Sequence, residues 1–327
     1  MSAKIRAGIY GYGNIGKSVE KAIMRSNDIT AEAVFTRRDP GKIRTLSGTK
    51  VIGADKVSEF KDKIDVMLLC GGSATDLPVQ GPELVKEFNI VDSYDTHAKI
   101  PDYMKKIDSE ARQNKKAAII SAGWDPGLFS IMRSLFMSVL PEGENNTFWG
   151  PGVSQGHSDA LRRVEGVSDA IQYTVPSEKI FNDVKNRSQA TFTMKQKLKR
   201  ICYVVAEKNA DKEKIKKTVK QMPNYFADYE TDVIFISSEE MKKEHSMMNH
   251  AGNMFRNGST DKNEEHQMEF RIKIDSNPGF TASIMVAYAR AAFRLFNEKN
   301  YGAKTVLDVP VSYLSAMERE QQIKELL

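Results

Sequence analysis

A glycine-rich turn near the start of the chain restricts its fold more than any other feature. Residues 11–16 read Gly-Tyr-Gly-Asn-Ile-Gly, a complete G-x-G-x-x-G. The stretch before it, Lys4 to Tyr10, ends in an apolar run that predicts a buried parallel strand, and Lys17 to Ser26 after it predicts a helix. Ala31 to Phe35 then predicts a second strand. This order predicts a dinucleotide-binding βαβ unit, with a glycine turn in some other α/β fold as the alternative.

Two arginines, Arg37 and Arg38, follow Thr36 where the second strand is expected to end. NAD-binding proteins usually carry an Asp or Glu there, which accepts hydrogen bonds from the ribose hydroxyls and would repel a 2′-phosphate. Guanidinium groups instead offer positive charge and a planar set of donors that suits phosphate. We therefore expect NADP(H) rather than NAD(H) as the cofactor, with an ordinary solvated charge pair as the alternative.

The first third of the chain continues to alternate strands and helices. Strands are expected at Asp65–Cys70, Asn89–Asp92 and Ala117–Ser121, and helices at Pro82–Phe88 and Pro101–Gln113. This pattern predicts an α/β fold, a Rossmann-type doubly wound parallel sheet. Open parallel sheets bind ligands at the carboxyl ends of their strands, so the loops that follow these strands should carry the cofactor contacts.

Beyond Leu140-Pro141 the pattern changes to that of a second, α+β domain. Lys197–Val205 and Gln267–Asp275 alternate in polarity as strands with one solvated face do. Further strand candidates lie around Phe148, Tyr173, Val204, Ile234 and Phe270. We expect a mainly antiparallel sheet in a substrate-binding and dimerisation domain over 126–296. The dinucleotide-binding domain would cover 1–125, with 297–327 returning to it.

Four further segments complete the expected secondary structure. Asn277-Pro278-Gly279 opens a long helix that should continue through Phe296. The polar segment from Met247 to Glu265 predicts a long loop, and such loops in compact domains are often functional. Val306 to Val309 predicts a short strand, and a charged helix should close the chain.

Composition excludes several classes of protein. The chain has no apolar run of membrane-spanning length, and it enters a strand too early to leave room for a signal peptide. The two cysteines, Cys70 and Cys202, make neither a disulfide framework nor a metal-ligand cluster, so no metal is expected and a reducing cytoplasm fits. The net charge of +5 is spread out, and the lysine-rich stretches lack interleaved aromatics, so nucleic-acid binding is not expected.

Four short clusters combine glycine, aromatic and polar residues without helical or strand periodicity. They are residues 93–95, 123–127, 148–152 and 155–159. Aromatic walls with a few polar groups are what a small-molecule pocket needs. Asp95 and Asp125 each follow an expected parallel strand, so both should lie beside the cofactor, where carboxylates suit an ammonium group. A turn or helix-capping role for either residue is the alternative.

The chain resembles the meso-diaminopimelate D-dehydrogenases, NADP-dependent enzymes of bacterial lysine synthesis. The resemblance extends over nearly the whole chain, and its most specific part is the run from Thr147 to Arg163. The other motifs that carry it are Gly11–Asn14, Thr36–Arg38, Gly72–Asp76, Gly123–Gly127, Met222-Pro223 and Asn277-Pro278.

The resemblance implies the reversible oxidative deamination of the D-centre of meso-2,6-diaminopimelate. The products would be L-2-amino-6-oxopimelate, which cyclises to tetrahydrodipicolinate, together with ammonia and NADPH. The resemblance also implies a homodimer, because members of the family are commonly dimeric. The partners expected are therefore a small-molecule substrate and a second copy of the chain, with no nucleic acid and no membrane.

The resemblance also implies which residues form the site. Asp95 and Asp125, the implied catalytic groups, would lie around the reacting end of the substrate with Trp149, and Gln155 and Asp159 would be close by. The remaining substrate contacts implied are Thr174, Arg200, His250 and Asn277. The implied cofactor-binding residues are Gly11, Tyr12, Gly13, Asn14, Ile15, Thr36, Arg37, Arg38, Gly72, Ser73, Ala74, Thr75, Ser93, Tyr94, Asp95, Ala122, Gly123, Trp124, Asp125 and Pro126.

Residue chemistry agrees with some of these roles and leaves others open. Arg200 can bind a carboxylate through two parallel hydrogen bonds, although a basic run such as Lys195–Arg200 otherwise predicts a solvated face. His250 in a polar segment otherwise predicts a surface histidine. His157 invites a role as acid or base, but we expect it to support the pocket or begin a helix. No single general base is assigned.

Two other functions are compatible with the same two-domain plan. One is a related NADPH-dependent reductase of the dihydrodipicolinate or saccharopine reductase type, although the basic, histidine-rich loop of the first is missing here. The other is an NADPH-sensing regulatory protein. The set of Asp125, Trp149, Gln155 and Arg200 argues against a sensor, because a sensor need not keep a substrate pocket.

Overall fold

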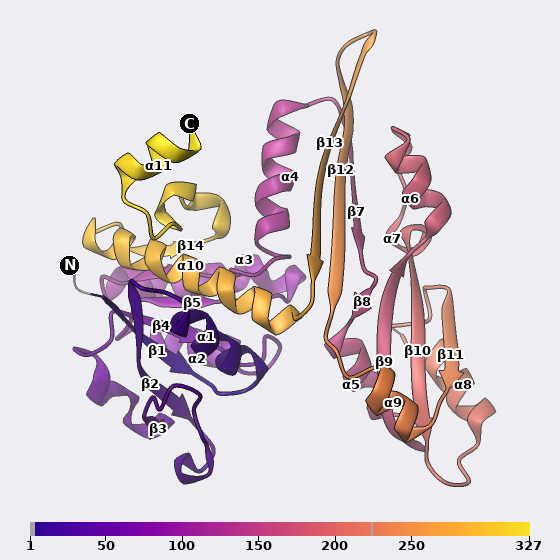
Figure 1. Ribbon diagram of the computed structural model, residues 1–327, viewed down its shortest axis with the longest axis horizontal. Helices are drawn as coiled ribbons and strands as arrows, with labels where there is room; N and C mark the ends of the chain where they lie inside the picture. The colour runs from indigo at the N-terminus through magenta and orange to yellow at the C-terminus, as the bar shows by residue number, and fades with distance from the viewer. Residues whose placement is uncertain (1–3, 224) are drawn as a thin grey trace. The chain divides into compact units, whose positions relative to one another are not determined.

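The strand before the glycine turn lies in the middle of a seven-stranded parallel sheet (Figure 1). A computed structural model describes residues 4–223 and 225–327, and for Gln155 the backbone only. The order of the sheet is β14-β6-β5-β4-β1-β2-β3. Its strands are β1 (Ile5–Tyr10), β2 (Ile29–Thr36), β3 (Val51–Gly53), β4 (Val66–Leu69), β5 (Ile90–Asp92), β6 (Ala117–Ile119) and β14 (Gly302–Lys304). All pairings are parallel, which confirms the predicted doubly wound sheet.

Helices cover this sheet, and its short strands β4, β5, β6 and β14 are buried throughout. The helices of this part of the chain are α1 (Asn14–Met24), α2 (Leu77–Leu84), α3 (Ile100–Gln113), α10 (Asn277–Asn297) and α11 (Arg319–Leu326). The 3-10 turns are η1 (Pro40–Lys42), η2 (Ala54–Phe60), η3 (His97–Lys99), η4 (Val306–Asp308) and η5 (Val311–Tyr313). Every residue of β4 and β5 is buried, as expected for strands covered on both faces.

Two smaller sheets, mainly antiparallel as predicted, form the other part of the chain. One has the order β11-β10-β9-β8 and the other the order β13-β12-β7. Their strands are β7 (Gly143–Trp149), β8 (Gly152–Val153), β9 (Val167–Pro176), β10 (Leu198–Ala206), β11 (Thr231–Phe235), β12 (His250–Asp261) and β13 (Glu264–Ile274). The helices are α5 (Gln155–Arg162), α6 (Glu178–Lys185), α7 (Met194–Lys197), α8 (Lys212–Lys220) and α9 (Ser238–Glu244), while α4 (Leu128–Val139) leads in. The pairing of β10 with β11 is parallel.

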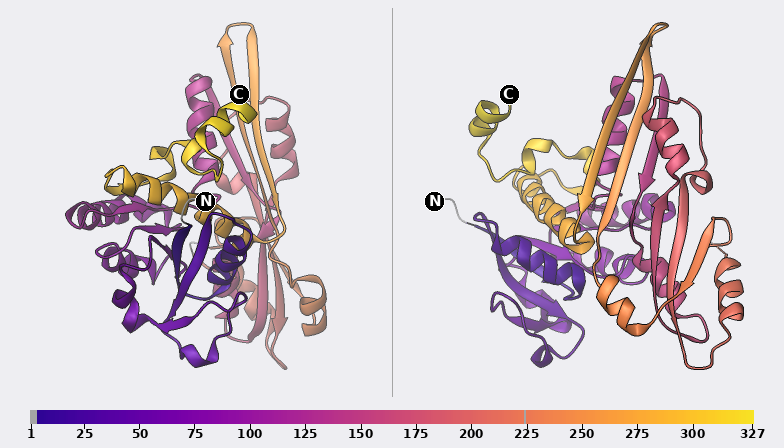
Figure 2. Two further views of the ribbon diagram at one scale, coloured as in Figure 1. Left: turned by 60° about the vertical axis from the view of Figure 1, so that its left-hand side comes forward. Right: turned by 45° about the vertical axis from the view of Figure 1, so that its right-hand side comes forward.

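The expectation of a long loop from Met247 to Glu265 is wrong, because most of this segment forms the strand β12. This strand pairs with β7 on one side and β13 on the other, and β12 and β13 make the long orange hairpin of Figure 2. Two of its polar side chains are buried with partners: Arg256 donates to the carbonyl oxygen of Leu140 at 2.8 Å, and Asn257 donates to two backbone carbonyls. Tertiary hydrogen bonds thus satisfy side chains whose polarity alone predicts solvent.

Two shorter expectations are also wrong. Val306–Val309 is not a strand: Val306–Asp308 is a 3-10 turn, because Thr305 and Asp308 cap it reciprocally. The strand that joins the parallel sheet is β14, just before it. The helix expected at Pro82–Phe88 lies earlier, as α2, and carries a proline in its first turn where no N–H partner is needed.

The chain divides into two units at other positions than expected. The first unit is Met1–Ile131 with Pro278–Leu327, and the second is Met132–Asn277. Residues 126–131 and nearly all of α10 therefore belong to the first unit rather than to a 126–296 domain. Arg290 of α10 donates to both carboxylate oxygens of Asp28, at 2.7 and 2.9 Å, which ties this helix to the turn before β2. Among the described residues, no helix is both long and apolar enough to cross a membrane.

Candidate active site

The glycine turn lets α1 begin close against β1. A Cβ on Gly16 would lie 2.0 Å from the carbonyl oxygen of Gly11, so a side chain there would push the helix away. A Cβ on Gly13 would meet nothing within 4 Å, so the backbone is open on that side. No side chain caps the first N–H groups of α1. An open, uncapped helix N-terminus suits the pyrophosphate of a dinucleotide.

Tyr12 of this turn has a buried side chain that faces away from such a ligand. Its side chain is 3% exposed, and its hydroxyl donates to the carboxylate of Glu20, which is itself fully buried. Glu20 also accepts hydrogen bonds from the backbone N–H groups of Leu46 and Ser47, at 3.0 and 2.9 Å. Although burial acts to raise it, these hydrogen bonds hold the pKa of Glu20 below its ordinary value. Only the backbone of Tyr12 is left for the cofactor role expected of it.

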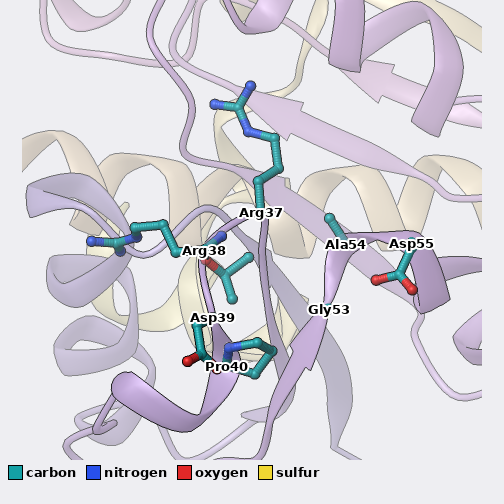
Figure 3. Close-up of a pocket in the computed structure, with 8 residues that line it drawn as sticks. Arg37, Arg38, Asp39, Pro40, Gly53, Ala54 and Asp55 are labelled. Atoms are coloured by element: carbon teal, nitrogen blue, oxygen red, sulfur yellow. Dashed lines mark hydrogen bonds between the residues drawn. The ribbon is translucent and has the colours of Figure 1, made fainter.

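A pocket of about 430 Å³ lies where β2 ends (Figure 3). Its lining residues are Thr36, Arg37, Arg38, Asp39, Pro40, Gly53, Ala54 and Asp55. The two guanidinium groups point in different directions from the end of the strand (Figure 3). Arg38 donates to the carbonyl oxygen of Tyr12 at 2.7 Å, and Arg37 donates to the carboxylate of Asp76 at the same distance. The predicted arginines thus lie together at one pocket, with one of them tied to the glycine turn.

The loop after β4 contacts the loop after β5. Ser73, among the residues expected to contact the cofactor, accepts a hydrogen bond from the backbone N–H of Asp95 at 2.8 Å. Gly72 donates its N–H to Asp76 at 2.8 Å, so that the same carboxylate serves this loop and Arg37. The carboxylate of Asp95 is exposed. Sequence reasoning assigned no separate role to Asp76, whose ion-pair partner Arg37 is distant in the chain.

The loop after β6 carries the second expected catalytic carboxylate. Gly123 donates its N–H to the carbonyl oxygen of Pro126 at 3.0 Å, which closes a tight turn around Asp125. Trp124 is buried, with its ring edge-on to Phe129 at 5.5 Å between centroids, and Asp125 is half-buried. Because β5 and β6 are neighbours in the sheet, the loops bearing the two carboxylates lie next to each other.

In the second unit, Arg200 forms the centre of a buried polar cluster. Arg200 on β10 is directly opposite Thr174 on β9, and its guanidinium donates to the Thr174 hydroxyl. Its guanidinium carbon lies 4.2 Å from the centre of the Tyr229 ring. The side chain is only 7% exposed, and burial lowers the pKa of Arg200 from its ordinary value. The Nε atom is buried and has no acceptor among the described residues, so this cation has a donor to offer a ligand.

His250 lies against Gly152, a glycine that pairs with Thr174 of this cluster. Gly152 of β8 pairs with Thr174, and a Cβ on it would come within 2.4 Å of the imidazole of His250. His250 is 9% exposed, and burial lowers the pKa of its imidazole. The interpretation of His250 as a surface histidine is therefore excluded. Thr174 and Arg200 lie on the paired strands β9 and β10, whereas His250 begins β12 in the other sheet and lies against Gly152 of β8. Tyr229 is a member that no sequence signal indicated.

The remaining expected substrate residues have other surroundings. Trp149 ends β7, half-buried, and pairs with Gly252 of β12. Asp159 is exposed on α5, where its carboxylate accepts a hydrogen bond from Arg162 one turn along. Asn277 is half-buried at the start of α10, and its backbone N–H donates to the carbonyl of Met248 at 2.9 Å. The side chain of Gln155 lies outside the described residues.

His157 is packed rather than poised for proton transfer. It lies in the first turn of α5, is hydrogen-bonded to the hydroxyl of Ser154, and meets the rings of Tyr225 and Phe226 at 5.4 and 5.8 Å. Burial, and secondarily the charge of Arg200, lowers the pKa of His157 to about 4. No group of three or more histidine, cysteine, aspartate or glutamate side chains in the described ranges is arranged to hold a metal ion.

The depressed pKa of His157 predicts a pH-dependent stability. As the pH falls below 6.5, the ordinary pKa of histidine, His157 becomes protonated in the unfolded chain. In the folded chain it stays neutral until about pH 4. Between these two pH values, the free energy of unfolding should fall by up to about 1.4 kcal/mol for each unit by which the pH is lowered, because of this residue. Urea unfolding at pH 5 and pH 7 should show a smaller loss for His157→Gln than for the wild type. Equal losses would contradict the assignment.

Comparison with known proteins places this geometry in one family. The model of the diaminopimelic acid dehydrogenase C-terminal domain matches residues 123–276. The meso-diaminopimelate D-dehydrogenase of Acetivibrio thermocellus is 52% identical over 327 residues, covering 99% of this chain and 98% of the relative.

Two solved structures share the whole fold. A mutant of the meso-diaminopimelate dehydrogenase of Clostridium tetani, solved with DAP, is 48% identical with a TM-score of 0.94 and covers 99% of this chain and 100% of that one. An engineered D-amino acid dehydrogenase bound to NADP⁺ is 40% identical with a TM-score of 0.89, at the same coverage. With both units matched end to end, the chain belongs to the meso-diaminopimelate D-dehydrogenase family.

Proposed function

We propose that this protein catalyses the NADP-dependent, reversible oxidative deamination of the D-centre of meso-2,6-diaminopimelate. The products are L-2-amino-6-oxopimelate, which cyclises to tetrahydrodipicolinate, ammonia and NADPH. The observation that carries the proposal is the buried Arg200, which donates to Thr174 and whose Nε has no acceptor among the described residues. A buried cation with a free donor suits a carboxylate better than it suits any neutral group. Family membership favours this reaction over the reductase and sensor alternatives.

The substrate carries an amino-acid group at each end, and we assign the two ends to different residues. Arg200, Thr174 and His250 bind the carboxylate of the end that does not react, with Asn277, Gln155 and Asp159 as further contacts. Asp95, Asp125 and Trp149 surround the end that reacts. Holding both ends gives stereochemical selection, because the wrong configuration at the reacting carbon would turn its hydrogen away from the cofactor.

The cofactor that we assign to the pocket after β2 is NADP⁺. The residues present fit its 2′-phosphate, because Arg37 and Arg38 line the pocket and each guanidinium has more N–H donors than its hydrogen bond to Asp76 or to Tyr12 uses. The backbone of the glycine turn suits the pyrophosphate, and the loops after β4, β5 and β6 suit the nicotinamide half. When bound, NADP⁺ supplies the acceptor for the hydride that leaves the D-carbon.

Asp95 and Asp125 contribute charge and orientation to the reaction. The substrate amine must lose a proton before its carbon can give up a hydride, because an ammonium nitrogen has no lone pair. The nitrogen then becomes cationic as the iminium forms, and nearby carboxylates stabilise that charge. The same groups orient the water that adds to the imine before ammonia leaves. Positioning and electrostatics of this kind supply most of the rate acceleration in comparable reactions.

We further propose a homodimer that works in the cytoplasm. Leu135 and Val139, one turn apart on α4, are each about half exposed, and apolar side chains that share one helix face favour an interface between copies. Both cysteines are free thiols, which suits a reducing compartment.

Turnover with defined stereoisomers tests the proposed function. Purified protein should reduce NADP⁺ in the presence of meso-diaminopimelate and show little reaction with the L,L isomer, which lacks a D-centre. The absence of turnover with the meso isomer would overturn the proposal. Turnover only with saccharopine or dihydrodipicolinate would support a reductase, and cofactor binding without turnover of any amino acid would support a sensor.

Removing both arginines of the β2 pocket should weaken NADP⁺ specifically. We expect the double variant Arg37→Ala and Arg38→Ala to raise the KM for NADP⁺ by about 30-fold, the equivalent of about 2 kcal/mol of charge-assisted hydrogen bonding. The KM for NAD⁺ should change little, because NAD⁺ has no 2′-phosphate. Arg44→Ala, an exposed arginine in the same segment that does not line the pocket, is the control. An unchanged KM for NADP⁺ in the double variant would refute the assignment.

Replacing the buried arginine should affect the substrate and not the cofactor. Arg200→Met should raise the KM for meso-diaminopimelate by about 30-fold or more, since losing one partner of a buried ionic contact costs at least about 2 kcal/mol. The dissociation constant of NADP⁺ should stay within about twofold. Lys199→Met, which removes an adjacent charge paired with Glu230 on the surface, should leave both values unchanged. Equal weakening of substrate and cofactor by Arg200→Met would contradict its role.

A further inference from the structure

A fully buried carboxylate, that of Asp92, lies at the carboxyl end of β5. One of its oxygens, Oδ1, accepts hydrogen bonds from the backbone N–H groups of Tyr94 at 2.9 Å and of Ser121 at 3.0 Å. The other oxygen, Oδ2, accepts a hydrogen bond from the hydroxyl of Tyr103 at 2.7 Å. Burial raises the pKa of Asp92, and these three donors act against that rise. A buried carboxylate is costly unless its oxygens are paired in this way.

The two backbone donors belong to the two loops that carry the proposed catalytic carboxylates. Tyr94 immediately precedes Asp95, and Ser121 begins the segment that leads to Asp125. The backbone carbonyl of Asp92 also accepts the N–H of Ala122 at 2.8 Å, so Asp92 holds the second loop at two successive residues. One residue therefore connects the loop after β5 to the loop after β6.

The loop after β6 needs such a contact. Ser121 has a φ of +59°, a left-handed conformation that is strained for a residue with a side chain. This conformation turns the chain sharply out of β6 toward Asp125. The hydrogen bond from its N–H to the Asp92 carboxylate stabilises the residue in this conformation.

The position of Asp92 is itself held from the other side. Tyr103 of α3 is 4% exposed, and its ring stacks on that of Tyr94 with 4.2 Å between centroids. Tyr103 and Tyr94, whose rings stack, thus both donate to the carboxylate of Asp92, Tyr103 through its hydroxyl and Tyr94 through its backbone N–H. Asp95 has a separate contact of its own, because its backbone N–H donates to the hydroxyl oxygen of Ser73.

We propose that Asp92 is a positioning residue for the reaction, which sets the carboxylates of Asp95 and Asp125 relative to each other through the backbone of their loops. The inference rests on the proposed function. It assigns to Asp92 no contact with substrate or cofactor. Geometry errors of about 1 Å introduced away from the reacting atoms can cost about 100-fold in rate, so a residue of this kind should affect kcat far more than binding.

Asn89 is the natural control, because it has the corresponding place at the other end of the same strand. It is 4% exposed, its side-chain amide donates to the carbonyl of Asp65 at 2.8 Å, and its oxygen accepts the N–H of Ala117 at 2.9 Å. Asn89 thus bridges the starts of the neighbouring strands as Asp92 bridges the loops at their ends. Its loss should destabilise the sheet without moving Asp95 or Asp125.

The experiment compares Asp92→Ala, Asp92→Asn and Asn89→Ala in the full chain. Asp92→Ala should lower kcat for meso-diaminopimelate by about 100-fold, while the dissociation constant of NADP⁺ stays within about threefold. Asp92→Asn keeps a neutral oxygen for the two N–H groups, so its kcat should fall by only about tenfold. Asn89→Ala should lower the melting temperature comparably but leave kcat within about twofold.

A kinetic isotope effect separates positioning from general destabilisation. With substrate deuterated at the D-carbon, Asp92→Ala should show a larger isotope effect on kcat than the wild type, because slowed C–H cleavage becomes the limiting step. Asn89→Ala should keep the wild-type value. If Asp92→Ala does not fold, Asp92→Asn decides the question by the same two measurements.

The outcomes distinguish this inference from the proposed function. A wild type without turnover overturns the function on which the inference rests. A wild type with turnover, together with Asp92→Asn or Asp92→Ala that retains kcat within twofold, overturns the positioning role alone. A fall in kcat for Asn89→Ala equal to that for Asp92→Ala, with unchanged isotope effects in both, would reduce Asp92 to a structural residue.

Discussion

The need of every buried polar group for a hydrogen-bond partner organises both units of this protein. Glu20, Asp92 and Arg256 are all buried, and each is paired with groups distant in the sequence. Because an unpaired buried carboxylate or guanidinium is costly, each of these side chains holds the segments that supply its partners. The segments held by Glu20 and Asp92 carry expected cofactor-binding and catalytic residues.

In the first unit, buried carboxylates hold the loops at the carboxyl ends of the parallel strands. Glu20 connects the glycine turn to residues 46–47, and Asp92 connects the loops after β5 and β6. The loop after β4 is joined to its neighbour through Ser73. The order of the parallel strands brings these loops together at the carboxyl ends of the strands, and the buried carboxylates then set the positions of the loops. The second unit applies the constraint differently, since Arg200 keeps a buried Nε without an acceptor among the described residues. A ligand carboxylate would complete that set.

Sequence reasoning was most successful where the signal is local. Five of the parallel strands, the long helix α10 and the antiparallel character of the second unit follow from periodicity and turn residues, and the structure confirms them; β3 and β14 were not expected. It failed for β12, because Arg256 and Asn257 are polar side chains whose partners lie far along the chain. It also placed Val306–Val309 in a strand, since a short apolar run has no period that distinguishes a strand from a capped turn.

The sequence by itself determined the dinucleotide-binding unit, the two arginines after β2 and the family, because glycine spacing, residue charge and motif order can all be read along the chain. Tertiary structure decided how those residues are used. It buried the Tyr12 side chain against Glu20, brought Arg200 opposite Thr174 and His250 against Gly152, and joined two loops at Asp92. These relations depend on which distant groups share a buried site, and the cost of leaving a polar group unpaired there has no local signature in the sequence.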